Sequence, residues 1–531
     1  MTSNEKTSGD NRRPRRPQRT RVGRNYSSSP KRPQNGDRPG GQNAGRGPRK
    51  GSAKGGNNNR QGAGNNRGKR RSGSPRRRRN DKAPALEHRL NTETKGPAIP
   101  EITDEDTVRI ITVSGVEEIG RNMNIIETKD DIIVIDAGFA FVSEDTGTPG
   151  VDYILPNTQY LEERKHKIRA LVVTHGHLDH IGGIPFIMER IGNPPIYTQN
   201  LTSLMILKRQ EEFPHAEPIQ MNVIKEGESF TVGTTRIKTF RVTHSIPDAM
   251  GVCVETKHGD VVITGDIKLI HEDGKVVVEE RGQWEKVGQN NNLALLCDST
   301  NSDRAGFSVS EAKVFETLEQ IIRTAKGRLI VGTFASQFDR LISVIKTCED
   351  LGKKVVLEGR SIKTNVEIAI RAGLVEVKPD TVIQANDISE YPADRIVVLS
   401  TGAQGEQFAA LMRMATDKHK FITLNERDTI VLSSSVIPGN EIAVQKLKDN
   451  IYRKNVRVIN YQGSHVHASG HGNAGELVWV SQTVKPKFLI PVHGHHYHLK
   501  SHMYAAIDNG FPRDNVLVPD NGTILDIKNG S

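Results

Sequence analysis

Short apolar runs alternate with helical stretches from about residue 106 to about residue 432. Val, Ile and Leu dominate the runs, and each run ends in a turn signal or a polar residue, which is typical of buried strands. The runs lie at 131–138, 168–174, 260–265, 293–296, 328–332, 354–357, 395–399 and 429–432, with helical periodicity at 308–325 and 336–350. This alternation predicts an α/β protein in which helices flank the sheets.

The chain has 531 residues, which is more than one hydrophobic core supports, so two or three domains are expected. Its charge is uneven. Residues 1–100 hold 27 of the 74 Lys and Arg and 6 of the 63 Asp and Glu, a net charge of 27 − 6 = +21, and the remainder carries 47 − 57 = −10.

The basic N-terminal segment, residues 1–105, consists largely of Arg, Gly, Asn, Pro and Ser. We expect it to be a disordered tail, because such a composition cannot bury enough apolar surface to offset the entropy of ordering. Arg-rich, Gly-rich segments bind phosphate backbones by releasing counterions, so the tail is expected to contact RNA or protein partners in RNA decay. A solubilising or targeting arm is the alternative.

The three cysteines, Cys253, Cys297 and Cys348, are far apart and form no CxxC pair. They are expected to be free buried thiols in a reducing compartment. The N-terminus lacks the apolar core of a signal peptide, and no apolar run approaches the ~20 residues of a membrane span. We therefore predict a soluble cytoplasmic protein with no membrane partner.

The most specific motif is Thr-His-Gly-His-Leu-Asp-His at 174–180, where a predicted strand ends and a helix is expected at 181–191. His175 and His177 can face one metal ion while Asp179 and His180 face a second. Imidazole combined with carboxylate favours zinc, with manganese or magnesium as alternatives. The motif predicts a site for two Zn²⁺ ions.

Two ions need more ligands, and three candidates follow later predicted strands. His244 follows 240–243, His493 follows 487–492, and Asp266 follows 261–265, where a carboxylate could bridge both ions. Asp136, on an early strand, is expected to hold a ligand in place rather than to bind metal.

A paired metal site lowers the pKa of a bridging water and stabilises charge on a phosphoryl oxygen during displacement. The leaving oxygen then needs a proton. Asp298 ends a predicted strand and His471 lies in the run Ala468–Gly472. We expect the Asp298 carboxylate to orient the His471 imidazole and raise its pKa, which suits a general acid. Strand-end capping is the alternative role of Asp298.

The order of these motifs resembles that of the metallo-β-lactamase superfamily, in its β-CASP nuclease branch, and within that branch the bacterial ribonuclease J family. The resemblance covers residues 106–531. The stretches that carry it are Glu118–Met123, Val134–Gly138, Thr174–Gly183, Thr243–Ile246, Thr264–Asp266, Asp298–Asn301, Gly359–Ser361, Gly402–Glu406, Pro438–Glu441, Ser469–His471 and Pro491–Gly494.

The resemblance implies a four-layer αβ/βα sandwich made from two stretches, 106–310 and 463–531. It implies an α/β β-CASP domain inserted between them, at 311–462. The implied activity is a zinc-dependent phosphodiesterase that degrades 5′-monophosphorylated single-stranded RNA in the 5′→3′ direction, with endonuclease activity, in RNA processing and mRNA decay.

The resemblance also implies roles for single residues. His175, His177 and His244 would hold one metal, Asp179, His180 and His493 the other, and Asp266 both. Residues near the scissile phosphate would be His467, Ala468, Ser469, Gly470 and His471. A 5′-phosphate pocket would include Arg360, Ser361, Gln404 and Gly405, because Arg and successive backbone N–H groups bind phosphate. Ordinary strand-to-helix turns are the alternative for the last four.

The sequence departs from the family at Ser336–Asp339, where relatives carry Asn-Ile-His, and at His493–His498, where they carry His-Gly-Glu. The extra histidines are expected to be solvated, with an adventitious metal site as the alternative. The chain ends at Ser531 without the C-terminal domain through which many relatives dimerise, so a homo-oligomer stays open.

Three other functions compete with an RNA-cleaving enzyme. A small-molecule hydrolase, such as a lactonase or thioesterase, would not need the 227 positions from Asp266 to His493. A catalytically inactive RNA-binding scaffold would not need an intact ligand set. A β-CASP nuclease that acts on DNA is the alternative that the sequence leaves open.

Overall fold

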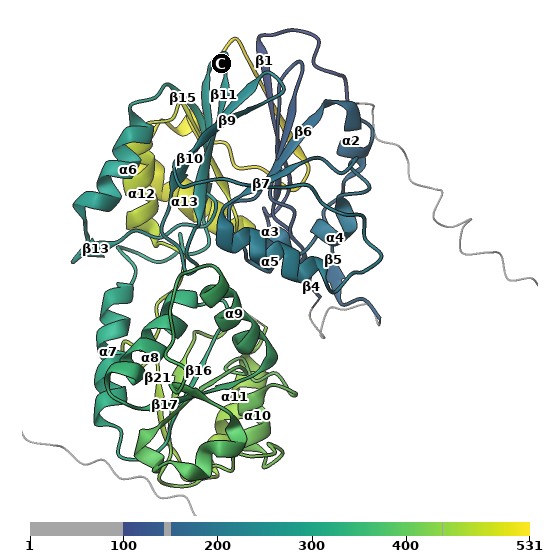
Figure 1. Ribbon diagram of the computed structural model, residues 1–531. Coiled ribbons are helices and arrows are strands. Elements are labelled where there is room, and N and C mark those ends of the chain that lie inside the picture. Colours follow the sequence, from purple (N-terminus) through teal and green to yellow (C-terminus); the bar gives the residue numbers. More distant parts are fainter. Residues whose placement is uncertain (1–98, 143–149, 438) are drawn as a thin grey trace, which may run out of the picture. The chain divides into compact units, whose positions relative to one another are not determined.

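The computed structural model describes residues 99–142, 150–437 and 439–531. Its central elements are two facing β-sheets with helices on their outer sides (Figure 1). The first sheet has the order β23 (Thr523–Lys528), β1 (Thr107–Ser114), β2 (Met123–Glu127), β3 (Ile132–Ile135), β6 (Ile168–Val172), β7 (Ile196–Thr198), β8 (Met221–Val223). The second has the order β22 (Phe488–Val492), β15 (Asn292–Asp298), β12 (Gly259–Ile263), β11 (Met250–Thr256), β10 (Thr235–Arg241), β9 (Ser229–Val232).

The central strands of these sheets are buried on both faces. In β3, Ile133 and Ile135 face a core shared by the two sheets, and Ile132 and Val134 face a second core beneath helices. Successive side chains of a strand point to opposite faces, so a strand covered on both sides needs apolar residues at every position. This explains why the apolar runs are continuous rather than alternating.

Helices cover the outer face of each sheet, which gives four layers. Against the first sheet lie α2 (Gln159–Glu162), α3 (Leu178–Ile181), α4 (Ile184–Ile187) and α5 (Asn200–Gln210). Against the second lie α6 (Val278–Gly288), α12 (Ala474–Val484) and α13 (His496–Asp508). Short hairpins β4 (Ala140–Phe141) with β5 (Tyr153–Ile154) and β13 (His271–Glu272) with β14 (Lys275–Val276), and 3₁₀ turns at Lys165–Lys167 and Arg513–Asn515, complete this part.

A third sheet is entirely parallel and comes from one continuous stretch of the chain. Its order is β18 (Val382–Ile383), β17 (Lys354–Glu358), β19 (Ile396–Ser400), β16 (Leu329–Thr333), β20 (Thr429–Ser433), β21 (Arg457–Asn460). Its helices are α7 (Glu311–Thr324), α8 (Phe338–Asp350), α9 (Arg360–Arg371), α10 (Ala410–Ala415) and α11 (Glu441–Tyr452), with 3₁₀ turns at Ala385–Glu390 and Ala393–Arg395. The predicted class, an α/β sandwich with an inserted α/β domain, is confirmed.

The expectation of a helix at 181–191 is wrong. The run 181–191 forms no continuous helix, because Gly182 and Gly183 separate the short helices α3 and α4. A Cβ atom on Gly182 would lie 2.1 Å from the Phe139 ring, so this turn is built around close packing that only glycine permits.

Other expectations have mixed outcomes. The three cysteines are buried and free, as predicted. Among the helices of the described residues, none is both long and apolar enough to cross a membrane. Residues 1–98 of the predicted basic tail lie outside the described residues.

A buried carboxylate joins the two facing sheets, between the start of β3 and the turn from β9 to β10. Asp131, just before β3, is 1% exposed and accepts hydrogen bonds from Arg169 Nε at 2.6 Å and from Thr234 N at 2.6 Å and Oγ1 at 2.7 Å. Burial alone would raise the pKa of Asp131, but the Arg169 guanidinium and the Thr234 donors outweigh it and lower the pKa.

We expect the free energy of unfolding of the Asp131→Asn variant to be about 1–3 kcal/mol lower than that of the wild type near neutral pH, because the buried donors lose a charged acceptor. A carboxyl group whose pKa is lowered by folding contributes stability above its unfolded pKa of about 3.9 and loses it as the pH falls through the folded pKa. Thermal unfolding of both proteins from pH 7 to pH 3 should therefore show the difference closing in acid. A difference independent of pH would contradict this assignment.

Candidate metal centre

The predicted ligands converge because the strands that deliver them run in one direction. In the second sheet, β12, β15 and β22 are parallel neighbours, and β10 has the same direction because β11 lies antiparallel between it and β12. In the first sheet, β3 and β6 are parallel. Side chains that follow the carboxyl ends of such strands meet at one edge.

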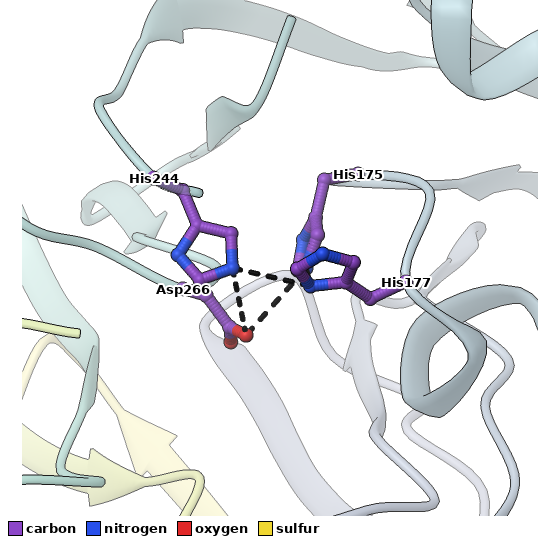
Figure 2. A group of neighbouring side chains, drawn as sticks. All are labelled: His175, His177, His244 and Asp266. Atoms are coloured by element: carbon purple, nitrogen blue, oxygen red, sulfur yellow. Dashed lines mark hydrogen bonds and ion pairs between the residues drawn. The ribbon is translucent and has the colours of Figure 1, made fainter. Parts of the chain in front are cut away.

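Four side chains form the first cluster, shown in Figure 2: His175, His177, His244 and Asp266. His175 Nε2 and His244 Nε2 lie 3.1 Å and 3.2 Å from His177 Nδ1. The same two nitrogens lie 3.5 Å and 3.7 Å from Asp266 Oδ2. Ligand atoms about 2.0–2.1 Å from a tetrahedral zinc ion are roughly 3.3–3.4 Å apart, so these spacings fit one ion.

Asp179, His180, Asp266 and His493 form the second cluster. His180 Nε2 and His493 Nε2 lie 3.3 Å and 3.4 Å from Asp266 Oδ1, and 3.5 Å and 3.3 Å from Asp179 Oδ2. Asp266 therefore turns one oxygen to each cluster. Its Oδ1 atom is buried without a hydrogen-bond partner among the described residues, as expected of an atom that binds a metal.

Neighbouring groups fix which imidazole nitrogen faces the clusters. Asp136 Oδ2 accepts a hydrogen bond from His180 Nδ1 at 2.8 Å and is itself held by Thr174. The carbonyl of Gly470 accepts from His244 Nδ1 at 2.7 Å. In both rings Nε2 therefore faces the clusters, the usual arrangement of metal-binding histidines. Asn122 Nδ2 lies 3.1 Å from His180 Nε2, and Ser245 Oγ lies 3.3 Å from His244 Nε2.

Burial and charge divide the histidines into two groups. Burial holds the pKa of His175 and His244 well below the ordinary value and that of His177 at about 4, so these rings are neutral. Burial also disfavours charge on His180 and His493, but Asp266 and the other nearby carboxylates outweigh it and raise both pKa values. Such proton–carboxylate pairing is what a metal replaces when it binds.

A carboxylate–imidazole pair lies beside the second cluster. Asp298, at the end of β15 and fully buried, accepts from His471 Nδ1 at 2.8 Å. Burial lowers the pKa of His471, but Asp298 and Asp266 outweigh it and the pKa is raised. The structure thus joins two groups 173 residues apart, and His471 Nε2 lies 3.9 Å from Asp266 Oδ2. Their roles remain predictions.

The two candidate phosphate loops lie next to each other. They follow the neighbouring strands β17 and β19, and Thr401 N donates to the carbonyl of Glu358 at 3.0 Å. Arg360 and Ser361 are exposed at the start of α9. Gln404 is different, since its buried amide donates to Ser434 and Ser435 and accepts from Ile437 N. Its side chain therefore shapes the loop after β20 and is not free to bind phosphate.

The departures from the family pattern lie in two environments. Phe338 belongs to the core, and Asp339 has a pKa raised to about 6 by burial and by Glu311. Of the extra histidines, His496 is exposed as expected, with its Nδ1 3.5 Å from Asp520 Oδ1. The expectation is wrong for His498, which is buried and accepts a hydrogen bond from His495 N at 3.2 Å. Sequence reasoning missed Thr300, whose hydroxyl contacts Asp298 and His493, although it stands two residues after a predicted catalytic carboxylate.

Two family models match this chain. One, for the metallo-beta-lactamase superfamily, covers residues 117–296, and the other, for the ribonuclease J beta-CASP domain, covers residues 326–451. With the four-layer fold and the His/Asp clusters, these matches define a metallo-β-lactamase hydrolase that carries a β-CASP domain and a metal-binding site.

Curated relatives narrow the class. Ribonuclease J of Mycoplasma pneumoniae is 36% identical, over 81% of this chain and 75% of its own length. Ribonuclease J of Mycolicibacterium smegmatis is 38% identical, over 80% of this chain and 75% of its own length. Ribonuclease J2 of Bacillus subtilis is 33% identical, over 80% of this chain and 76% of its own length. The chain belongs to the ribonuclease J family, RNA-cleaving hydrolases that act as 5′→3′ exonucleases and as endonucleases in RNA processing and decay.

A solved structure shares the fold alone. It is a protein of unknown function from Enterococcus faecalis V583, 17% identical, with a TM-score of 0.55. It covers 79% of this chain, and the match spans 100% of that structure.

We expect the Asp136→Asn variant to bind metal about 10- to 100-fold more weakly, because a neutral amide orients His180 less firmly. Asn also suits the left-handed backbone at this position, where φ is 62°. Asp248→Asn is the matched control, since Asp248 has φ of 60° and contacts Thr202 rather than a predicted ligand. Equilibrium dialysis against zinc measures both. Equal affinities would show that Asp136 does not support the site.

Proposed function

We propose that this chain is a two-zinc ribonuclease that degrades single-stranded RNA from a 5′-monophosphate end and also cuts internally. The observation that carries this proposal is the pair of Asp266 oxygens, one in each cluster of imidazoles, with the Asp298–His471 pair 3.9 Å away. A pair of zinc ions, when bound, supplies the positive charge that activates a water and stabilises a phosphorane-like transition state.

The ligands divide between the ions as their distances suggest. His175, His177 and His244 would hold one ion, Asp179, His180 and His493 would hold the other, and Asp266 would bind both. His175, His177 and His244 have lowered pKa values, so they are neutral and keep a nitrogen lone pair for a metal. Each cluster offers four ligands, a number that suits zinc. Manganese is the alternative, because it takes the same nitrogen and oxygen donors.

His471 would donate the proton that the leaving 3′-oxygen needs. Its Nδ1 is engaged by Asp298, so the proton available for transfer lies on Nε2. The carboxylate raises the pKa of the ring and keeps this proton in place until bond cleavage. Residues 467–470 would contact RNA beside the scissile phosphate, since they precede His471 in the same loop.

The 5′-end preference would come from the adjoining loops 359–361 and 402–406. Arg360 is exposed at the first turn of α9, where backbone N–H groups and the helix dipole favour an anion. Gln404 and Gly405 would act through the shape of the second loop, because a Cβ atom on Gly405 would lie 2.2 Å from the carbonyl of Ala443.

Action on DNA is the second candidate. The names of the curated relatives favour RNA, and cleavage rates on single-stranded RNA and DNA of the same sequence would decide between the two.

Replacing Asp179 or His180 with Ala should abolish RNA cleavage and leave the fold intact, because both side chains serve the metals rather than a core. The His471→Ala variant should keep its metal content and lose about 10²–10⁴-fold in rate, the usual contribution of a positioned acid. Single-turnover assays with metal analysis distinguish the two effects. Wild-type turnover by a metal-analysed Asp179 or His180 variant would refute the two-metal site.

Exonucleolytic decay should be faster on 5′-monophosphate RNA than on 5′-hydroxyl or 5′-triphosphate RNA with one shared body. The hydroxyl end offers no anion, and the triphosphate is too large for a pocket formed by two short loops. The Arg360→Ala variant should lose most of this preference while its endonuclease rate stays unchanged. If the wild type degraded RNA with all three 5′ ends at equal rates, the proposed 5′-phosphate pocket would be contradicted.

A further inference from the structure

The loop that carries His467 and His471 is held by side chains along almost its whole length. Five of its carbonyls accept a hydrogen bond from a side chain: Val466 from Ser433 at 2.6 Å, Ala468 from Arg340 at 3.4 Å, Ser469 from Lys268 at 3.0 Å, Gly470 from His244 at 2.7 Å and His471 from Asn301 at 3.0 Å. Ser433 and Arg340 belong to the parallel-sheet part, and the other three donors to the sandwich. Both parts therefore fix the position of this loop.

Arg340 is the donor that contacts both the His467 ring and the Ala468 carbonyl of this loop. It lies on α8, is 1% exposed, and donates from Nη1 to His467 Nδ1 at 2.9 Å and to the carbonyl of Ser433 at 3.2 Å. Its Nε and Nη2 atoms donate to Glu311 Oε1 at 3.1 Å and 2.6 Å. A buried guanidinium is tolerated only with such a partner. Glu311 begins α7, and its other oxygen lies 3.8 Å from Lys268 Nζ.

The contact with Arg340 decides the protonation of His467. A guanidinium can only donate hydrogen bonds, so His467 Nδ1 must be the acceptor and the ring proton lies on Nε2. Burial, together with the cations Arg340 and Lys268, lowers the pKa of His467 to about 2. The ring is half-buried, and its hydrogen bond to Arg340 engages Nδ1, which leaves the neutral Nε2–H as the donor that a ligand could use.

We propose that Arg340, held by Glu311, is a positioning residue for RNA cleavage: it keeps His467 in the form that donates from Nε2 to an oxygen of the scissile phosphate. The inference rests on the proposed function, since it takes His467 to contact RNA. Arg340 itself need not touch RNA. Its effect reaches the reaction through His467 and through the carbonyl of Ala468 in the loop that ends at His471.

The Arg340→Lys variant tests this, because lysine keeps the charge and loses the fork of donors. Its matched control is Arg328→Lys. Arg328 is another buried arginine of the parallel-sheet part, just before β16, and its hydrogen bonds go to Asp428 Oδ2 at 2.6 Å and the Thr423 carbonyl at 2.7 Å. We expect Arg340→Lys to lower kcat about 10- to 100-fold with KM and zinc content unchanged, since small misplacements of reacting groups cost this much. Arg328→Lys should keep the wild-type kcat at an equal or lower melting temperature.

A second set of variants tests whether Arg340 acts on the reaction through His467. In His467→Gln the amide N–H takes the place of Nε2–H, whereas in His467→Asn it lies near Nδ1 and faces Arg340, so Gln should retain more activity than Asn. Adding Arg340→Lys to His467→Ala should cost little beyond the slower single variant. Fully additive losses, or equal kcat values for Arg340→Lys and Arg328→Lys, would overturn the inference. A wild type that binds zinc and cleaves no RNA would instead refute the proposed function. If Arg340→Lys folds poorly, the comparison of His467→Gln with His467→Asn supplies the test with Arg340 in place, and equal rates of these two variants would overturn the inference.

Discussion

The Asp266 carboxylate, 2% exposed between five imidazoles, is the interaction on which the site depends. A buried carboxylate is costly unless opposite charge or hydrogen bonds compensate it, and here one oxygen has no hydrogen-bond donor. The compensating groups come from strand ends far apart in the sequence. The sandwich has to assemble completely, with β22 beside β15, before His493 can reach Asp266 and Asp179.

Rigidity around this centre comes from paired groups rather than from the ligands alone. Asp136 orients His180, the Gly470 carbonyl orients His244, and Thr300 contacts His493. The Gly470 contact also connects the first metal cluster to the loop that carries His471. A predicted metal ligand and the loop of the predicted acid are thus in direct contact, His244 Nδ1 lying 2.7 Å from the Gly470 carbonyl.

The inserted parallel sheet contributes to the same centre by a different route. It supplies no predicted metal ligand, but Arg340 and Ser433 hold the loop at 466–468 from its side. The loops that follow β17 and β19 adjoin at the carboxyl edge of that sheet, the position where parallel sheets usually bind ligands. The proposed 5′-phosphate pocket would lie at this edge of the sheet.

The sequence by itself determined the fold class and the core of the metal motif. A strand that is apolar at every position, such as Ile132–Ile135, has to be covered on both faces. His175, His177, Asp179 and His180 lie close in space because they lie close in the chain. The distant ligand candidates His244, Asp266 and His493 followed from their positions after later predicted strands. The resemblance to a known family then divided the ligands between the two metals.

Only the tertiary structure decided the contacts that depend on long-range packing. The pairing of Asp298 with His471 could be guessed from their chemistry, but its 2.8 Å geometry could not. Gln404 was expected to bind phosphate, and its amide proves to be used by the main chain of the next loop. The break at Gly182 depends on a Phe139 ring some forty residues earlier, and Arg340 looks in sequence like any polar residue of an amphipathic helix. Local patterns record which faces of an element are apolar; which polar atoms meet across elements depends on how those faces pack.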